Sequence, residues 1–341
     1  MEDGSTSGDV PPGPWGLSIQ YDDAVDLPAP TVRPVNPVLP DTVTMLEHAP
    51  SGGRVYIVGT VHLGEKSQED VAATIRTVKP DSVMLELCTE RLDILTVDED
   101  EARRALSPLS ELNRKHFHIL AQQLGVAQAF RVFWALKQSG QHAKNLGISG
   151  SDMRTAFREA ANLPNCTVLL GDRPQSITHQ RTYGALTLWE YIRHLWIAVR
   201  DLCVHWNISQ DDVEKLKTSA FLEADAARMS AACPTVQRAI VHERDVVMAE
   251  GLKWFLAQPV MTTEGPRSRV MVGVVGMAHV AGIQRAWNRP SLSQNEQKNL
   301  FTIPPTAKWR ERAPVVVKVS WLLLCGYITS RGGRFLANLV R

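Results

Sequence analysis

The amino-acid sequence predicts an α/β fold with a mixed or mostly parallel central sheet and a large helical insertion. One observation is the order strand, helix, strand within residues 54–87. In such a βαβ unit the two strands are normally parallel and the crossover connection is right-handed. A second is the return of short apolar segments at residues 166–171 and 268–276, each of which ends at a glycine. A third is the helical periodicity of the residues between the strands, at 100–163 and 176–258.

The first unit is preceded by weak alternation of polar and apolar side chains at residues 42–48, which predicts a strand. A Gly-Gly pair at 52–53 then predicts a hairpin turn into a second strand at 54–59. The following helix is predicted to have Ser67 as its N-cap and to stop at Pro80. Its apolar positions recur at helical spacing, at Val71, Ile75 and Val78.

Among the later elements, the clearest is a helix at 234–258, with Pro234 near its start and Pro259 just after its end. A final strand at 268–276 leads into a helix that starts at about residue 278. These elements place the helical insertion between strands of one sheet.

Composition divides the chain into three predicted parts. Residues 1–40 are rich in Pro, Gly and Ser and lack periodicity, which predicts disorder, and residues 41–300 are predicted to form the folded domain. Residues 301–341 form an apolar tail with basic flanks. Its uninterrupted apolar part, 319–329, is shorter than the ~20 residues of a spanning helix, so 314–341 is predicted either to dock on the domain or to contact a membrane. The flanking arginines are Arg310, Arg312, Arg331 and Arg334.

Composition also excludes several classes of function. The formal net charge of +1 argues against nucleic acid as a partner. Five scattered cysteines without a Cys-x-x-Cys pair give no zinc ribbon or disulfide framework and favour a reducing compartment. The N-terminal residues lack a secretory signal pattern, which predicts an intracellular protein on the cytosolic side of membranes. The sequence also lacks a P-loop, a GxGxxG loop and a serine nucleophile elbow.

Two Gly-x-x-His segments, "VYIVGTVH" and "VGVVGMAH", each place a histidine one turn after the glycine that ends a predicted strand. Glycine at this point allows a close approach of backbone or ligand. Because ligands gather beyond the carboxyl ends of strands in open α/β sheets, His62 and His279 are predicted to meet at that edge. The alternative is that each histidine caps a helix or satisfies a buried carbonyl group.

Charged side chains follow two other predicted strands. Glu86 lies near the end of one predicted strand, with Arg91 just past it. A carboxylate near two imidazoles could bind a divalent metal ion or act as the base for a metal-bound water. The alternative is a plain Glu86–Arg91 ion pair. Asp172 and Arg173 lie at the end of another predicted strand. Asp172 could bind a metal ion or orient a residue that binds it. Arg173 could bind a substrate carboxylate or stabilise an oxyanion. The alternative there is a turn in which the aspartate is an N-cap.

The tetrapeptide "HERD" lies within the long predicted helix. His242 and Asp245 are separated by three residues and share a helix face, which resembles half of a helical metal site. Glu243 and Arg244 are adjacent and project from different sides. The alternative is a solvated or salt-bridged helix face.

These segments together resemble a known family. Residues 57–95 are similar to the opening block of the TraB-domain family, and "LLGDRP", "HERD" and "VVGMAHVAGI" resemble its later blocks in the expected order. The resemblance covers roughly residues 42–290. That family is similar to the Tiki-type proteases, and it shares their broad superfamily with erythromycin-esterase-like and haem-uptake proteins.

The resemblance implies a metal-dependent hydrolase, most concretely a peptidase, acting on a peptide or small molecule. The implied metal ligands are His62, His279 and Glu86, and the ion is Mn²⁺, Co²⁺, Fe²⁺ or Zn²⁺. The implied catalytic residues are Glu86, Arg91 and Arg173. The residues expected to support them or to contact substrate are Asp172, His242, Arg244 and Asp245. The alternative is a non-catalytic adaptor or tether that contacts an organelle membrane, such as the mitochondrial outer membrane, through 314–341.

Overall fold

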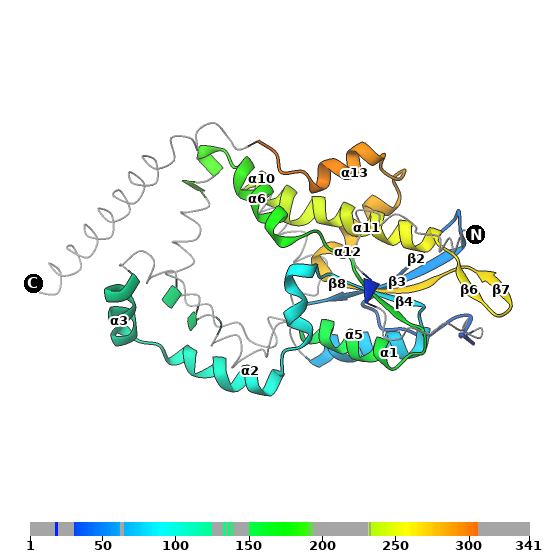
Figure 1. Ribbon diagram of the computed structural model, residues 1–341, viewed down its shortest axis with the longest axis horizontal. Helices are drawn as coiled ribbons and strands as arrows, with labels where there is room; N and C mark the ends of the chain where they lie inside the picture. The colour runs from blue at the N-terminus through cyan, green and yellow to red at the C-terminus, as the bar shows by residue number, and fades with distance from the viewer. Residues whose placement is uncertain are drawn as a thin grey trace, which may run out of the picture.

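In the part of the chain that the computed structural model describes, six strands form one sheet in the order β1-β5-β4-β8-β3-β2 (Figure 1). The strands are β1 (Ser18–Ile19), β2 (Val43–His48), β3 (Gly53–Thr60), β4 (Ser82–Leu85), β5 (Thr167–Leu170) and β8 (Val270–Gly276). The four central strands are parallel, and β1 and β2 pair antiparallel at the two edges. The predicted α/β fold with a mixed, mostly parallel sheet is confirmed.

The structure describes a defined set of residues: 18–19, 31–61, 65–124, 132–133, 136–137, 139, 150–190, 192–193, 231 and 233–305. Within this set, the parallel register brings the strand ends to one edge. Thr60 of β3 is paired with Gly276 of β8, and Leu85 of β4 is paired with both Val274 and Leu170. The carboxyl ends of these four strands therefore lie along one edge of the sheet, as the sequence predicted for parallel strands.

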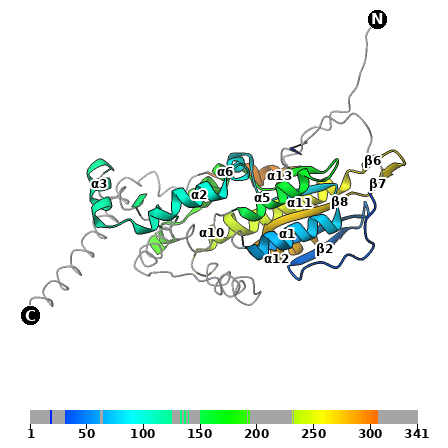
Figure 2. The same cartoon turned by 90° about the horizontal axis from the view of Figure 1, so that it is seen from below.

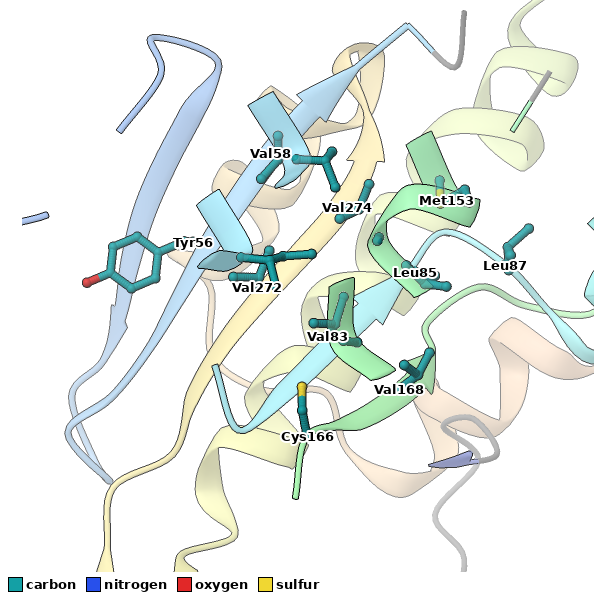
Figure 3. Packing of buried hydrophobic residues seen from close by; sticks show 14 of the residues in the cluster. Tyr56, Val58, Val83, Leu85, Leu87, Met153, Cys166, Val168, Val272 and Val274 are labelled. Carbon is teal, nitrogen blue, oxygen red and sulfur yellow. The ribbon is translucent and has the colours of Figure 1, made fainter. Parts of the chain in front are cut away.

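Helices cover both faces of the sheet. The helices α1 (Glu65–Val78) and α5 (Ser151–Ala161) lie on one face, and α11 (Glu243–Ala257) and α12 (Met277–Trp287) lie on the other (Figures 1 and 2). Figure 3 shows the packing on the first face. The alternation of the strands explains the two cores: Tyr56 and Val58 of β3 contact the first pair of helices, and Val55 and Ile57 contact the second.

Helices fill the two connections that leave β4 and β5. Between β4 and β5 lie η1 (Thr89–Leu95), α2 (Glu99–Leu106), η2 (Ser107–Glu111), α3 (Arg114–Leu124) and α5. Between β5 and β8 lie α6 (Gln175–Ala185), α10 (Pro234–Gln237), the π-helical η3 (Arg238–His242), α11 and the hairpin β6 (Val260–Thr262) and β7 (Gly265–Arg267). Figure 1 shows α2 and α3 reaching away from the sheet. The predicted helical insertion is therefore present.

Several local predictions are confirmed. Strands β2 and β3 form the expected hairpin, in which Gly52 has a φ of +65° that favours glycine. Helix α1 ends at Val78, before Pro80. Pro234 occupies the first turn of α10, and α11 ends before Pro259.

Other local predictions are wrong or incomplete. Ser67 is not an N-cap, because α1 already begins at Glu65 and Ser67 is buried inside the helix. The helix predicted at 234–258 is divided by the π-helical turn η3. The β6–β7 hairpin was not predicted. Helix α13 (Gln294–Phe301), which begins with a capping box of Ser293 and Glu296, was not predicted either.

The predicted parts at the two ends of the chain stay predictions. Residues 31–40 are described, and Arg33 donates a hydrogen bond to Asp81 at 2.7 Å, which fastens this segment to the start of β4. Most of 1–30, and the tail from residue 306 onward, lie outside the described residues. Among the described helices, none is both long enough and apolar enough to cross a bilayer.

Candidate functional site

Glu86 lies at the carboxyl edge of the sheet, on the face covered by α11 and α12. The alternation of β4 decides this face, because Val83 and Leu85 contact the opposite helices while Met84 contacts α11 and α12. The Glu86 side chain is buried, and its Oε2 accepts a 2.6 Å hydrogen bond from the backbone N–H of Gly276. The carboxylate is thereby held at the point where β8 gives way to α12.

His279 lies in the first turn of α12 and is buried between two carboxylates. Its Nε2 is 3.2 Å from Oε1 of Glu86, and its Nδ1 is 2.6 Å from Oδ1 of Asp245. Burial by itself lowers the pKa of His279, but Glu86 and Asp245 outweigh it and raise the pKa to about 9. A protonated ring donates from Nε2 to Glu86, whereas a neutral ring accepts from Nη1 of Arg244 at 3.3 Å.

Arg244 joins the strand ends through a single guanidinium group. Its Nε and Nη2 donate to the two carboxylate oxygens of Asp172 at 2.9 and 2.8 Å, and Nη2 also donates to Glu86. Burial lowers the pKa of Arg244, but the two carboxylates outweigh burial and raise it. Because Asp172 follows β5 and Glu86 follows β4, this arginine ties two neighbouring strands to α11.

The three charged residues of the "HERD" tetrapeptide contact three different sets of partners. Glu243 pairs with Arg173 and Arg181, Arg244 pairs with the strand-end carboxylates, and Asp245 binds His279. The π-helical turn η3 ends immediately before Glu243, and such turns are frequent at functional sites. The alternative of a solvated or salt-bridged helix face is therefore correct in part, because Glu243 and Arg244 form ion pairs and the side chain of His242 is 50% exposed.

Arg173 is completely buried and forms hydrogen bonds to groups of the fold. Its side chain donates to Glu243 and to Thr178, and also to the backbone carbonyls of Ala239 and Leu300. Burial lowers its pKa more than Glu243 raises it. This geometry assigns Arg173 a structural role, and its predicted role at an oxyanion stays a prediction.

The alternatives for Asp172 and Glu86 are both wrong. Asp172 is not the N-cap of α6, because its Oδ1 accepts from the Arg173 N–H and its carboxylate pairs with Arg244. Glu86 forms its ion pair with Arg244 instead of Arg91. Arg91 lies half-buried in η1, and within the described residues it has no hydrogen bond or ion pair with this cluster.

Two of the three predicted metal ligands come together. Glu86 and His279 approach to 3.2 Å, whereas His62 lies outside the described residues. Within the described residues, no three His, Cys, Asp or Glu side chains are arranged to hold a metal ion. Asp245 holds Nδ1 of His279 and leaves Nε2 facing a carboxylate oxygen, as in many metal-ligating histidines, and in this structure Arg244 contacts both Nε2 and that oxygen. The complete metal site stays a prediction.

A second buried contact at the same edge was missed by sequence reasoning. Thr60, the last residue of β3, donates a hydrogen bond to Asp152 at 2.5 Å, and neither side chain is more than 1% exposed. Asp152 lies in the first turn of α5, after Gly150 with its φ of +83°. No local pattern distinguishes Asp152, because 92 residues separate it from Thr60.

The fold and the buried charges define an α/β protein whose candidate site lies at the carboxyl ends of parallel strands. Residues 45–137 match the sequence profile of the TraB/PrgY/gumN family. The chain is 37% identical over 320 residues to the TraB domain-containing proteins of Bos taurus, Mus musculus and Homo sapiens, which covers 90% of this chain and 81% of each relative. The chain belongs to the TraB family, and the resemblance seen in its motifs is confirmed.

Proposed function

We propose that this protein is a divalent-metal-dependent hydrolase with peptidase-like chemistry, centred on Glu86 and His279. The observation that carries the proposal is the 3.2 Å approach of Glu86 Oε1 to His279 Nε2, in a buried position at the carboxyl edge of a parallel sheet. Ligands and reacting groups gather at this edge in open α/β folds. Ionisable groups that are buried together with shifted pKa values are typical of active sites.

The residues that would hold the ion are His62, Glu86 and His279. Imidazole and carboxylate ligands suit Mn²⁺, Co²⁺, Fe²⁺ and Zn²⁺, so the donor set is compatible with each of them. When bound, such an ion supplies Lewis-acid chemistry to a carbonyl group and to water. Asp245 supports this role because its Oδ1 fixes the His279 ring through Nδ1.

The neighbouring groups support work on a carbonyl substrate. The Gly276 N–H holds one oxygen of Glu86, so the other oxygen keeps a fixed direction from which to accept a proton. Nη1 of Arg244 lies 3.3 Å from Nε2 of His279 and brings a permanent positive charge to the same place. A guanidinium in this position favours negative charge that develops on a substrate oxygen.

The test measures metal content and peptide cleavage in the full chain. After reconstitution with each of the four ions, we expect stoichiometric metal in the wild type and its loss in Glu86→Gln, His279→Ala and His62→Ala. The control is His116→Ala, which removes an exposed histidine on α3. Cleavage of a peptide mixture, followed by mass spectrometry, should require the ion.

A folded protein that binds no metal would contradict the proposal. If the wild type keeps its circular dichroism spectrum and unfolding midpoint but retains no metal after reconstitution, the hydrolase proposal is wrong. A non-catalytic adaptor would then be the better description of the protein.

A further inference from the structure

A pocket adjoins the candidate site and shares Asp245 with it. The pocket has a volume of about 350 Å³ and lies between η3, α11 and α12. Its lining includes His242, Asp245, Gly282, Arg285 and Arg289. Asp245 connects the two places, because its Oδ1 binds His279 while its Oδ2 lies beside His242 and Gly282, two residues that line the pocket.

The floor of this pocket carries a buried acceptor that lacks a donor. Asp245 is only 2% exposed, and within the described residues its Oδ2 has no hydrogen-bond partner. Nδ1 of His242 is the nearby ring nitrogen, but at 3.9 Å it is too distant for a hydrogen bond. A buried carboxylate oxygen without a partner is unfavourable, so a ligand that brings an N–H donor would stabilise it.

One wall of the pocket, formed by α12 and the residues just after it, carries positive charge. Gly282 and Arg285 lie one turn apart on α12, and Arg289 lies two residues beyond the end of the helix at Trp287; all three line the pocket. Both arginines are exposed, and within the described residues neither guanidinium has a hydrogen-bond or ion-pair partner. They are therefore available to bind a carboxylate.

We propose that this pocket binds a small zwitterion, an amino acid or a dipeptide. The ligand ammonium group meets Oδ2 of Asp245, and its carboxylate meets Arg285 and Arg289. A simple anion would be repelled by Asp245, and a simple cation would be repelled by the arginines, whereas a zwitterion satisfies both charges. This binding needs neither a metal ion nor turnover, so it goes beyond the proposed hydrolase.

The test uses titration calorimetry on the full chain after removal of metal by a chelator. The probes are L-alanyl-L-alanine, its N-acetyl form, its C-terminal amide and inorganic phosphate. We expect the dipeptide to bind, and each blocked form to bind at least about tenfold more weakly, because each loses one charged hydrogen bond. Phosphate should bind no better than the blocked forms.

Substitutions at the pocket test which residues bind the dipeptide. The double change Arg285→Gln and Arg289→Gln should weaken dipeptide binding at least about tenfold. The matched control, Arg103→Gln with Arg104→Gln, removes two exposed arginines from α2 and should have no effect. Asp245→Asn should abolish the preference for the free ammonium group over the N-acetyl form.

Three results would overturn the proposal: no heat of binding at about 10 mM dipeptide, phosphate binding as tightly as the dipeptide, or unchanged affinity in the double arginine variant. Because all titrations are made without metal, a failure here is distinct from a failure of the hydrolase proposal.

Discussion

Gly282 allows α12 to pack directly against the Asp245 carboxylate, and replacing it with alanine tests this contact. A Cβ atom at position 282 would lie 1.8 Å from Oδ2 of Asp245 and 2.3 Å from its Cγ, distances that no pair of unbonded atoms adopts. The carboxylate must therefore move, or α11 and α12 must separate. Either change breaks the 2.6 Å hydrogen bond between Asp245 and His279.

The expected cost of Gly282→Ala follows from these two effects. Forcing an extra methyl group into a packed core costs about 1–3 kcal/mol. Loss of a hydrogen bond to a charged group costs about 1.5–3 kcal/mol. Alanine is the better helix former by about 1 kcal/mol, which offsets part of this cost. We therefore expect the free energy of unfolding to fall by about 1.5–5 kcal/mol, a sizeable part of the ~5–15 kcal/mol typical of a domain.

Urea unfolding, followed by circular dichroism, measures this loss. The matched control is Gly184→Ala in α6, where a Cβ atom meets nothing within 4 Å. Alanine is the better helix former, so this control should be neutral or stabilising by up to about 1 kcal/mol. If Gly282→Ala unfolds at the same urea concentration as the wild type, the close packing of Asp245 against α12 is refuted.

Three further predictions concern the charged cluster. In the metal-free protein, the folded-state pKa of His279 is about 9 and exceeds the ordinary value of 6.5. The stabilisation that protonated His279 gives the fold is therefore complete below about pH 6.5 and is lost as the pH rises to about 9. The urea midpoint should fall over this range, and a midpoint that does not change with pH would contradict the contacts of the His279 ring. Arg173→Ala should destabilise by about 3–5 kcal/mol, because it removes a fully buried side chain and one of the arginines paired with the partly buried Glu243. Arg91→Ala should change stability by less than about 0.5 kcal/mol, and equal unfolding midpoints for the two variants would argue against the structural role of Arg173. Arg244→Lys keeps the charge but not the forked contact with Asp172 and should cost about 2 kcal/mol, measured by thermal unfolding; an unchanged melting temperature would show that charge alone suffices.

The sequence by itself determined the sheet and two members of the site. Apolar strand segments that end at glycine, and the strand–helix–strand order, predicted parallel strands whose carboxyl ends meet. Glu86 comes directly after β4, and His279 lies three residues after the glycine that ends β8, so their approach could be predicted from their positions along the chain. This prediction depends on local sequence alone, because the end of a strand and the residues after it are neighbours along the chain.

Only the tertiary structure decided the partners of the charged side chains. The carboxylates of Glu86 and Asp172 are 158 and 72 residues from Arg244, and nothing in the intervening sequence specifies these pairs. The direction in which Arg244 and Asp245 project depends on the π-helical turn before them and on the close packing of α11 against Gly282. A helix has several faces, and which face turns inward depends on how the helix packs against the completed sheet.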